Sequence, residues 1–260
     1  MARSIWNGTI AFGLMSVPVK LHAATESKTV SFREVHLDDS SRIEHRRFCA
    51  KEDKEVPYKQ VVKGYEIDDD TYVVLDKDEI AAAAGDGAHR IDVEHFVDVG
   101  EIDPIFFDRT YYLGAGKDGA GPYRLLRDAL ERTGRAGIGR FTFHDREYLT
   151  AVRARDGVLV LHTLRFADEI VPGGEIDVPS PGRGPGEAEV KMAQRLIDTL
   201  HAAFRPEDYE DEYRAAVLAV IERKRKGEEI VPEEEPAADD SADLMAALEA
   251  SLDGARKGGR

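Results

Sequence analysis

The sequence predicts an α+β fold, in which an antiparallel β-barrel core carries an extended arm and is followed by C-terminal helices. Short runs of β-branched and aromatic residues recur between turn signals over about the first 170 residues, which is typical of a barrel or sandwich. A Pro/Gly-rich connector then precedes apolar residues at helical spacing. Between these, residues 42–59 are dense in charge and poor in core signal, which indicates a protruding arm.

The strand predictions follow the chain from its start. Apolar residues alternate with others over residues 10–12 and 17–21, on either side of Gly13, so we expect two strands joined by a bend. Asp156-Gly157 is a strong hairpin signal between two later runs. Further strands are expected at residues 71–75, 91–97, 106–113, 139–143, 148–153 and 158–165.

Helices are predicted from the apolar period. Residues 123–132 place Leu126 and Leu130 on one face. After the connector, the pattern runs to Phe204, is interrupted at Pro206 and resumes up to a basic cluster at residues 223–226. The expected boundaries are a core at residues 1–171 with an arm at about 31–70, a helical region at 172–227, and an acidic linker with a short helix at 228–260.

Composition limits the class of protein. With 260 residues and 42% hydrophobic content the chain can bury a sizeable core. Its apolar runs fall far short of the roughly 20 residues that cross a bilayer, so we expect a soluble protein with no membrane partner. The single cysteine, Cys49, cannot form an internal disulfide, which fits a reducing cytoplasm.

Charge is unevenly distributed along the chain. The formal net charge is -15, yet residues 1–60 carry a net +2 and residues 120–165 a net +4, whereas residues 61–119 carry -10 and residues 166–260 carry -11. An acidic protein of this kind can still bind a polyanion that touches only its positive segments.

Motifs for catalysis are absent from the sequence. There is no G-x-S-x-G, Walker A, Rossmann or H-E-x-x-H pattern. His144 and Asp145 are adjacent, so in a strand they point to opposite faces, and Cys49 has no second cysteine with which to hold a metal. We therefore expect no enzyme activity, no metal and no cofactor; a carboxylate-dependent hydrolase would need a pair of acids that the sequence does not nominate.

Basic residues gather in two places. The first set lies in the expected arm, and the second brackets the helix at residues 123–132 and the turn that follows. Such side chains suit phosphate contacts without base readout, although a solvated surface with no partner is the alternative. The sets are Arg42, Arg46, Arg47, Lys51, Lys54 and Lys59, and Arg124, Arg127, Arg132, Arg135 and Arg140.

An apolar stripe ends the acidic segment. Ser241 can cap a short helix in which Leu244, Leu248 and Leu252 repeat every four residues, with Met245 beside them. A helix this short is marginal alone in water, so the stripe requires a partner surface, either another protein or the core of this chain.

The sequence resembles the bacterial Ku proteins over almost its whole length, in order and at the spacing of that family. The resemblance begins with the run SIWNGTIAFGLMSVPVKLHAATES and continues through RIEHRRFC, EVPYKQVVKGYE, EIDPIFFDRTYYL, YRLLRDALERTGRAGIGRF, GVLVLHTLRFADEI, KMAQRLIDTL, FRPEDYEDEYR and DLMAALEASL.

This resemblance implies a non-catalytic homodimer. In that family two barrels and arms form a ring that threads onto double-stranded DNA ends, in the cytoplasm at the bacterial nucleoid. The ring recruits a multi-domain ATP-dependent DNA ligase for non-homologous end joining. The resemblance makes the arm cations and Arg135 the expected DNA contacts, and Leu244, Met245, Leu248 and Leu252 the expected ligase contacts.

Two differences from the family matter. Many relatives carry C-x-x-C where this chain has Cys49-Ala50-Lys51-Glu52, so a paired-thiol or zinc role is not expected here. Many also continue into a Lys-rich tail, whereas this sequence ends in ARKGGR, so we expect stricter dependence on free DNA ends. The competing hypothesis is a non-enzymatic protein–protein scaffold with no affinity for DNA.

Overall fold

The structure is a computed structural model that describes residues 3–83, 89–143, 146–178, 184, 186–228, 248–249 and 251–254. Its internal contacts divide the chain into two units. The first comprises Met1–Lys28 and Arg33–Glu175, and the second comprises Thr29–Phe32 and Ile176–Arg260. This division does not test the domain boundaries expected from the sequence, which remain predictions.

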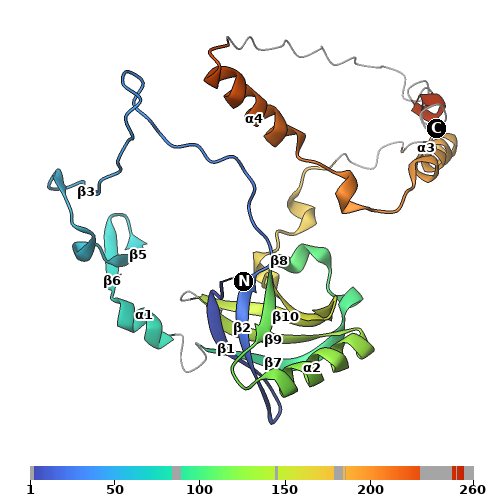
Figure 1. Cartoon of the computed structure of the whole chain (residues 1–260), viewed down its shortest axis with the longest axis horizontal. Coiled ribbons are helices and arrows are strands. Elements are labelled where there is room, and N and C mark those ends of the chain that lie inside the picture. The colour runs from blue at the N-terminus through green and yellow to red at the C-terminus, as the bar shows by residue number, and fades with distance from the viewer. Residues whose placement is uncertain are drawn as a thin grey trace. The chain divides into compact units, whose positions relative to one another are not determined.

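Seven strands of the first unit form a closed barrel in the order β1-β2-β8-β11-β10-β9-β7. Figure 1 shows the barrel, with all of these strands labelled except β11. The predicted barrel is therefore confirmed, and six of its seven strand pairs are antiparallel, while β1 and β7 pair in parallel. The strands are β1 (Trp6–Phe12), β2 (Met15–Ala23), β7 (Arg90–Asp98), β8 (Phe107–Ala115), β9 (Arg135–Phe143), β10 (Arg146–Arg155) and β11 (Val158–Leu164).

The barrel core follows from the period of two along each strand. In β2 the side chains of Val17, Val19 and Leu21 are buried, and in β11 Leu159 and Leu161 are fully buried. These residues belong to one cluster with the single tryptophan, Trp6, which is 7% exposed. Trp6 thus reports on the folding of the barrel core.

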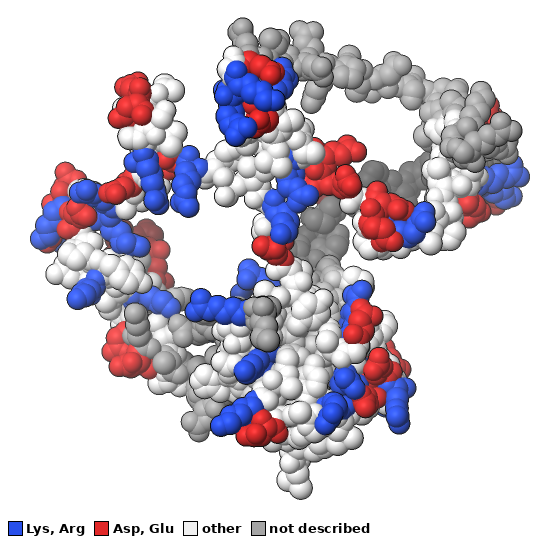
Figure 2. Space-filling model, in the orientation of Figure 1, with Lys and Arg blue, Asp and Glu red and all other residues white. Residues whose placement is uncertain are grey.

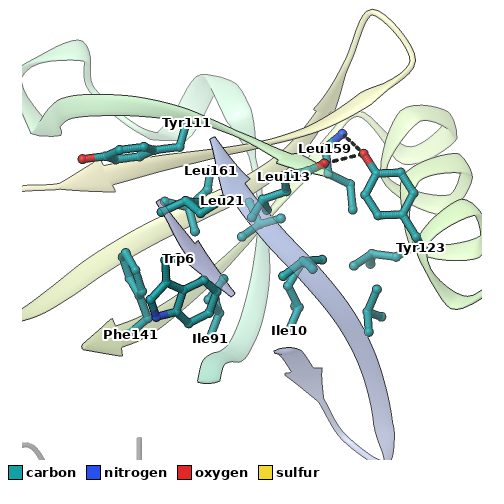
Figure 3. Close-up of a cluster of buried hydrophobic side chains, with 14 of the residues drawn as sticks. Trp6, Ile10, Leu21, Ile91, Tyr111, Leu113, Tyr123, Phe141, Leu159 and Leu161 are labelled. Carbon is teal, nitrogen blue, oxygen red and sulfur yellow. Dashed lines mark hydrogen bonds between the residues drawn. The ribbon is translucent and has the colours of Figure 1, made fainter. Parts of the chain in front are cut away.

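Helix α2 (Ala120–Thr133) packs on this core through Tyr123, Leu126 and Leu130. The predicted apolar face is confirmed, and the helix ends at Gly134, whose φ of 66° is left-handed. The buried Tyr123 hydroxyl donates to the Leu113 carbonyl oxygen at 2.6 Å and accepts from the Leu159 N–H at 2.9 Å (Figure 3). One side chain therefore connects α2 to two adjacent strands.

The chain between β2 and β7 forms the arm, defined here as residues 33–83. Residues 71–75, expected from the sequence as a strand of the barrel or sandwich, form instead half of a separate two-stranded sheet. Their β-branched run has the composition of a core strand, but every residue in it is exposed. The elements of the arm are β3 (Phe48–Cys49), β4 (Lys54–Glu55), η1 (Tyr58–Gln60), β5 (Lys63–Asp68), β6 (Thr71–Leu75) and α1 (Lys77–Ala83).

Short 3-10 turns connect the remaining elements of the first unit. A second apolar cluster of Ala136, Ala151 and Leu164 lies beneath one of these connections, the segment 99–107. The turns are η3 (Val99–Glu101), η4 (Pro104–Phe106), η5 (Ala167–Glu169) and η6 (Gly173–Glu175).

The second unit contains α3 (Glu187–Leu200), η7 (Pro206–Asp208) and α4 (Glu212–Arg225). The expected helical pattern is found, except that Phe204 lies beyond the end of α3 because the helix stops at Leu200. None of the described helices is long and apolar enough to cross a membrane.

The Tyr123 hydroxyl generates a stability prediction. We expect Tyr123→Phe to lower the free energy of unfolding by about 2–4 kcal/mol, because a buried carbonyl and a buried N–H each lose their partner. Urea unfolding followed by Trp6 fluorescence measures this loss. Tyr112→Phe is the matched control, since Tyr112 is 46% exposed and its hydroxyl forms no hydrogen bond within the described part of the chain. A loss no larger than that of the control would contradict the prediction.

Candidate nucleic-acid interface

The arm begins with a narrow antiparallel turn that positions Arg42. Val35 and Arg42 form a β-bridge, and the His36 N–H donates to the Ser41 carbonyl oxygen at 2.8 Å. The Ser41 N–H in turn donates to the carboxylate of Asp39 at 2.9 Å, which lowers the pKa of that carboxyl. Arg42 is therefore carried on a defined backbone structure.

A second turn, residues 47–56, positions the next cations. Phe48 pairs with Glu55 between β3 and β4, and the Val56 N–H donates to the Arg47 carbonyl oxygen at 2.8 Å. Lys51 lies in the connecting turn, which Asp53 helps to form with a positive φ of 46°. The turn thus brings Arg47 and Lys51 onto one small element.

Three of the cations predicted to contact DNA lie beside carboxylates. Arg46 lies 3.2 Å from Glu55 and 3.9 Å from Glu44. Lys54 is 2.5 Å from Glu52, and Arg135 is 3.3 Å from Asp98, its neighbour across the β7–β9 pair. Exposed pairs of this kind are worth about 0–1 kcal/mol, but a neighbouring carboxylate offsets part of the positive potential that these cations offer to a polyanion.

The other four predicted cations are Arg42, Arg47, Lys51 and Lys59. Among the residues that the structure describes, no carboxylate forms an ion pair with any of them. The Arg47 guanidinium lies 5.0 Å from the centre of the Tyr58 ring, which orients it by a cation–π interaction without neutralising its charge. These four residues, called the open cations below, retain their full charge for a ligand.

Three of the five members of the second basic set are ion-paired, Arg135 as described above. Arg127 forms an ion pair with Asp128 at 2.6 Å, and Arg140 lies 3.3 Å from Glu94 and 4.0 Å from Glu147. Figure 2 shows the same intermixing of basic and acidic side chains over the barrel surface. Of this second set, Arg124 and Arg132 form no ion pair with a described carboxylate, so the uncompensated cations are more numerous on the arm, where there are four, than in this set.

The β5–β6 hairpin of the arm exposes apolar side chains on both faces. Tyr65 and Val73 are directly opposite each other and are 69% and 45% exposed, and Val74 on the other face is 58% exposed. An isolated two-stranded sheet is marginally stable at best in water. The hairpin therefore has the properties of a surface that is covered in an assembly.

Cys49 gives no indication of a metal site. Its side chain is partly exposed, and within the described residues no group of three or more His, Cys, Asp or Glu side chains is arranged to hold a metal ion.

The expected ligase contacts are described only in part. Leu244 and Met245 lie outside the described residues. Leu248 is partly buried and Leu252 is 8% exposed in a helical turn at residues 251–254. Leu252 is thus already covered within this chain.

Two features were missed by the sequence analysis. The exposed apolar surface of the β5–β6 hairpin was not anticipated, because residues 71–75 were predicted as a barrel or sandwich strand from residue types that are common in buried strands, and Tyr65 fell within the expected arm. Arg153 and Arg155 in β10 were not selected, although they line a pocket with His162. Their spacing of two residues on a strand was the signal that they share a face.

Comparison with known proteins agrees with this architecture. The family model described as "Ku70/Ku80 beta-barrel domain" matches residues 11–194. A protein of Anaeromyxobacter sp. (strain K) named "Non-homologous end joining protein Ku" is 42% identical over all of this chain and 88% of its own length. Proteins with the same name in Solibacter usitatus and Bacillus subtilis are 37% and 34% identical, over 97% and 99% of this chain and 94% and 84% of their own lengths. The chain therefore belongs to the Ku family.

Proposed function

We propose that this protein is a homodimer that binds the ends of double-stranded DNA without sequence specificity and takes part in non-homologous end joining. The names of its relatives support the end-joining role. The proposal involves no catalysed step, no metal and no cofactor: the protein holds and protects DNA ends and recruits a DNA ligase.

The open cations are the observation that carries DNA binding. Phosphate contacts need positive charge and donors and do not read bases, and the arm supplies both on side chains that no described carboxylate neutralises. The net charge of -15 does not oppose this, because at physiological ionic strength an exposed charge is largely screened beyond about 8 Å.

Dimerisation is supported by the β5–β6 hairpin. Covering its exposed tyrosine and valine side chains with a second copy removes apolar surface from water, which stabilises the dimer. An arm that is held by a partner copy can then enclose a duplex. A ring closed in this way retains DNA by topology, so the affinity of each phosphate contact can be modest.

Ligase recruitment is assigned to the C-terminal stripe. Because Leu252 is covered within this chain, a ligase that binds the stripe has to displace that contact or use its other residues. The acidic segment that precedes the stripe supplies reach.

The experiment that tests the proposal compares one duplex sequence as a linear molecule and as a covalently closed circle, at physiological salt. We expect strong binding to the linear form alone. Equal binding to both forms would show general DNA binding and contradict end recognition. Binding to neither form would favour a protein–protein scaffold.

The open cations give a second prediction. We expect the double variant Arg47→Gln/Lys51→Gln to bind linear DNA more weakly and to lower the slope of log affinity against log salt by about 0.9 for each lost phosphate contact. Arg90→Gln is the control, because it removes one charge from a residue that is ion-paired with Asp92. A slope equal to that of the control would remove Arg47 and Lys51 from the interface.

The hairpin gives a third prediction. Val73→Lys/Val74→Lys is expected to weaken dimerisation more than about tenfold, because a lysine ammonium resists desolvation, whereas Thr71→Lys on the same strand has little effect. Sedimentation equilibrium measures the dimer, and Trp6 fluorescence verifies the barrel. If the double variant also binds DNA ends more weakly, electrostatic repulsion is not the cause, because lysine adds positive charge and DNA is negative. An unchanged dimer would exclude the hairpin from the interface.

A fourth prediction concerns the C-terminal stripe. Deletion of residues 241–260 is expected to spare binding to linear DNA and to abolish stimulation of the ligase in an end-joining assay. If DNA binding were lost instead, the segment would have a structural role.

A further inference from the structure

A pocket of about 550 Å³ lies on the outer face of the barrel. Most of its lining comes from three neighbouring strands, β8, β11 and β10, at alternate positions, and the rest comes from the segment after β2 and the turn between β10 and β11. Leu113 in β8 and Leu159 and Leu161 in β11 point into the core. Neighbouring residues on a strand point to opposite faces, so Tyr112, Val160 and His162 point outward. The residues that line the pocket are Ala24, Thr25, Thr110, Tyr112, Arg153, Arg155, Asp156, Val158, Val160 and His162.

His162 forms the floor of the pocket. It is 8% exposed, with its Nδ1 2.9 Å from the Thr110 hydroxyl and its Nε2 3.0 Å from the Arg153 Nε. Burial first, and then the charges of Arg153 and Arg155, lower the pKa of His162 to about 4. The ring is therefore neutral at neutral pH.

The protonation of this network follows from its donors. The Arg153 Nε–H can only donate, so His162 accepts at Nε2 and carries its proton on Nδ1. That proton is donated to the Thr110 oxygen, which leaves the Thr110 hydroxyl hydrogen free to point elsewhere. Since Thr110 lines the pocket, its O–H is available to a ligand.

Positive charge in the pocket exceeds negative charge. The Arg153 guanidinium is partly buried, and within the described residues no carboxylate pairs with it, so its terminal nitrogens retain their N–H donors. Asp156 is the single carboxylate of the lining, and among the described residues its one ion pair is with the Nε of Arg155, at 3.1 Å. Two guanidinium groups and a hydroxyl therefore present donors with few acceptors, which is the chemistry that recognises an oxyanion.

We propose that this pocket binds the phosphate group of a nucleotide, either free or at the end of a DNA strand. Two guanidinium forks and a hydroxyl suit the several oxygens of a phosphomonoester better than the two of a carboxylate. The volume exceeds that of a phosphate alone, and Tyr112, Val158 and Val160 supply an apolar wall for the attached nucleoside. The choice of a DNA end as the source rests on the function proposed above.

Calorimetric titration of the full-length protein tests the pocket. The probes are deoxyadenosine 5′-monophosphate and, without the phosphate, deoxyadenosine. We expect the monophosphate to bind and Arg155→Gln to weaken it by about tenfold, the loss of one charge-assisted contact. Arg155 is exposed and is not part of the His162–Arg153 hydrogen bond, so its replacement leaves that partly buried pair in place. Trp6 fluorescence verifies that each variant is folded.

The matched control is Arg146→Gln. Arg146 lies on the same strand, outside the pocket lining, and is ion-paired with Glu169 at 2.6 Å. The proposal is overturned if the monophosphate binds no better than deoxyadenosine, or if Arg155→Gln loses no more affinity than this control.

Competition distinguishes the two sources of phosphate. A blunt duplex with 5′-phosphates that displaces the monophosphate, where its 5′-hydroxyl counterpart does not, supports a DNA terminus as the ligand. If neither duplex displaces it, the retained binding of the monophosphate supports a free nucleotide. If the protein binds the monophosphate through Arg155 but does not prefer linear to circular DNA, the pocket proposal is supported and the proposed end-binding function is contradicted.

Discussion

The parallel pairing of β1 with β7 is the constraint on which the first unit depends. Thr9, Ile10 and Ala11 align with Arg90, Ile91 and Asp92, and this short contact closes the barrel. A closed barrel has no free edge at which other chains can pair. Because β2 ends at Ala23 and β7 begins at Arg90, the same closure fixes both ends of the long insertion between them. Both ends of the insertion therefore start from strands of the closed barrel, while the residues of the arm remain almost entirely exposed.

This arrangement separates stability from recognition. The core strands bury side chains such as Ile10, Leu21 and Ile91 completely, whereas the arm has no buried apolar residue among those described. Substitutions in the arm therefore alter a surface without altering the core that positions it. The Tyr123 hydroxyl has the opposite character, since it joins α2 to β8 and β11 inside the core.

The sequence predicted the barrel well because alternation and turn chemistry are local. Val17, Val19 and Leu21 have the period of a half-buried strand, and Asp156-Gly157 forms the turn between β10 and β11. Residues 71–75 were predicted as a barrel or sandwich strand because their β-branched composition is typical of strands. That composition does not indicate which sheet the strand joins. The pairing of Lys54 with Glu52 is local in sequence, whereas the pairing of Arg135 with Asp98 and the convergence of strands on the His162 pocket depend on contacts in space that no single stretch of sequence contains.

The two proposals assign two different modes of phosphate recognition to one protein. The open cations of the arm are solvated and exposed, so their affinity for a polyanion comes mainly from counterion release and falls steeply with salt. Arg153 differs because it is partly buried and held through Nε by a neutral histidine. A fixed, partly desolvated guanidinium gains from directed hydrogen bonds, which salt screens much less. In the two proposals taken together, the arm holds the DNA duplex and the barrel pocket recognises a single phosphate group.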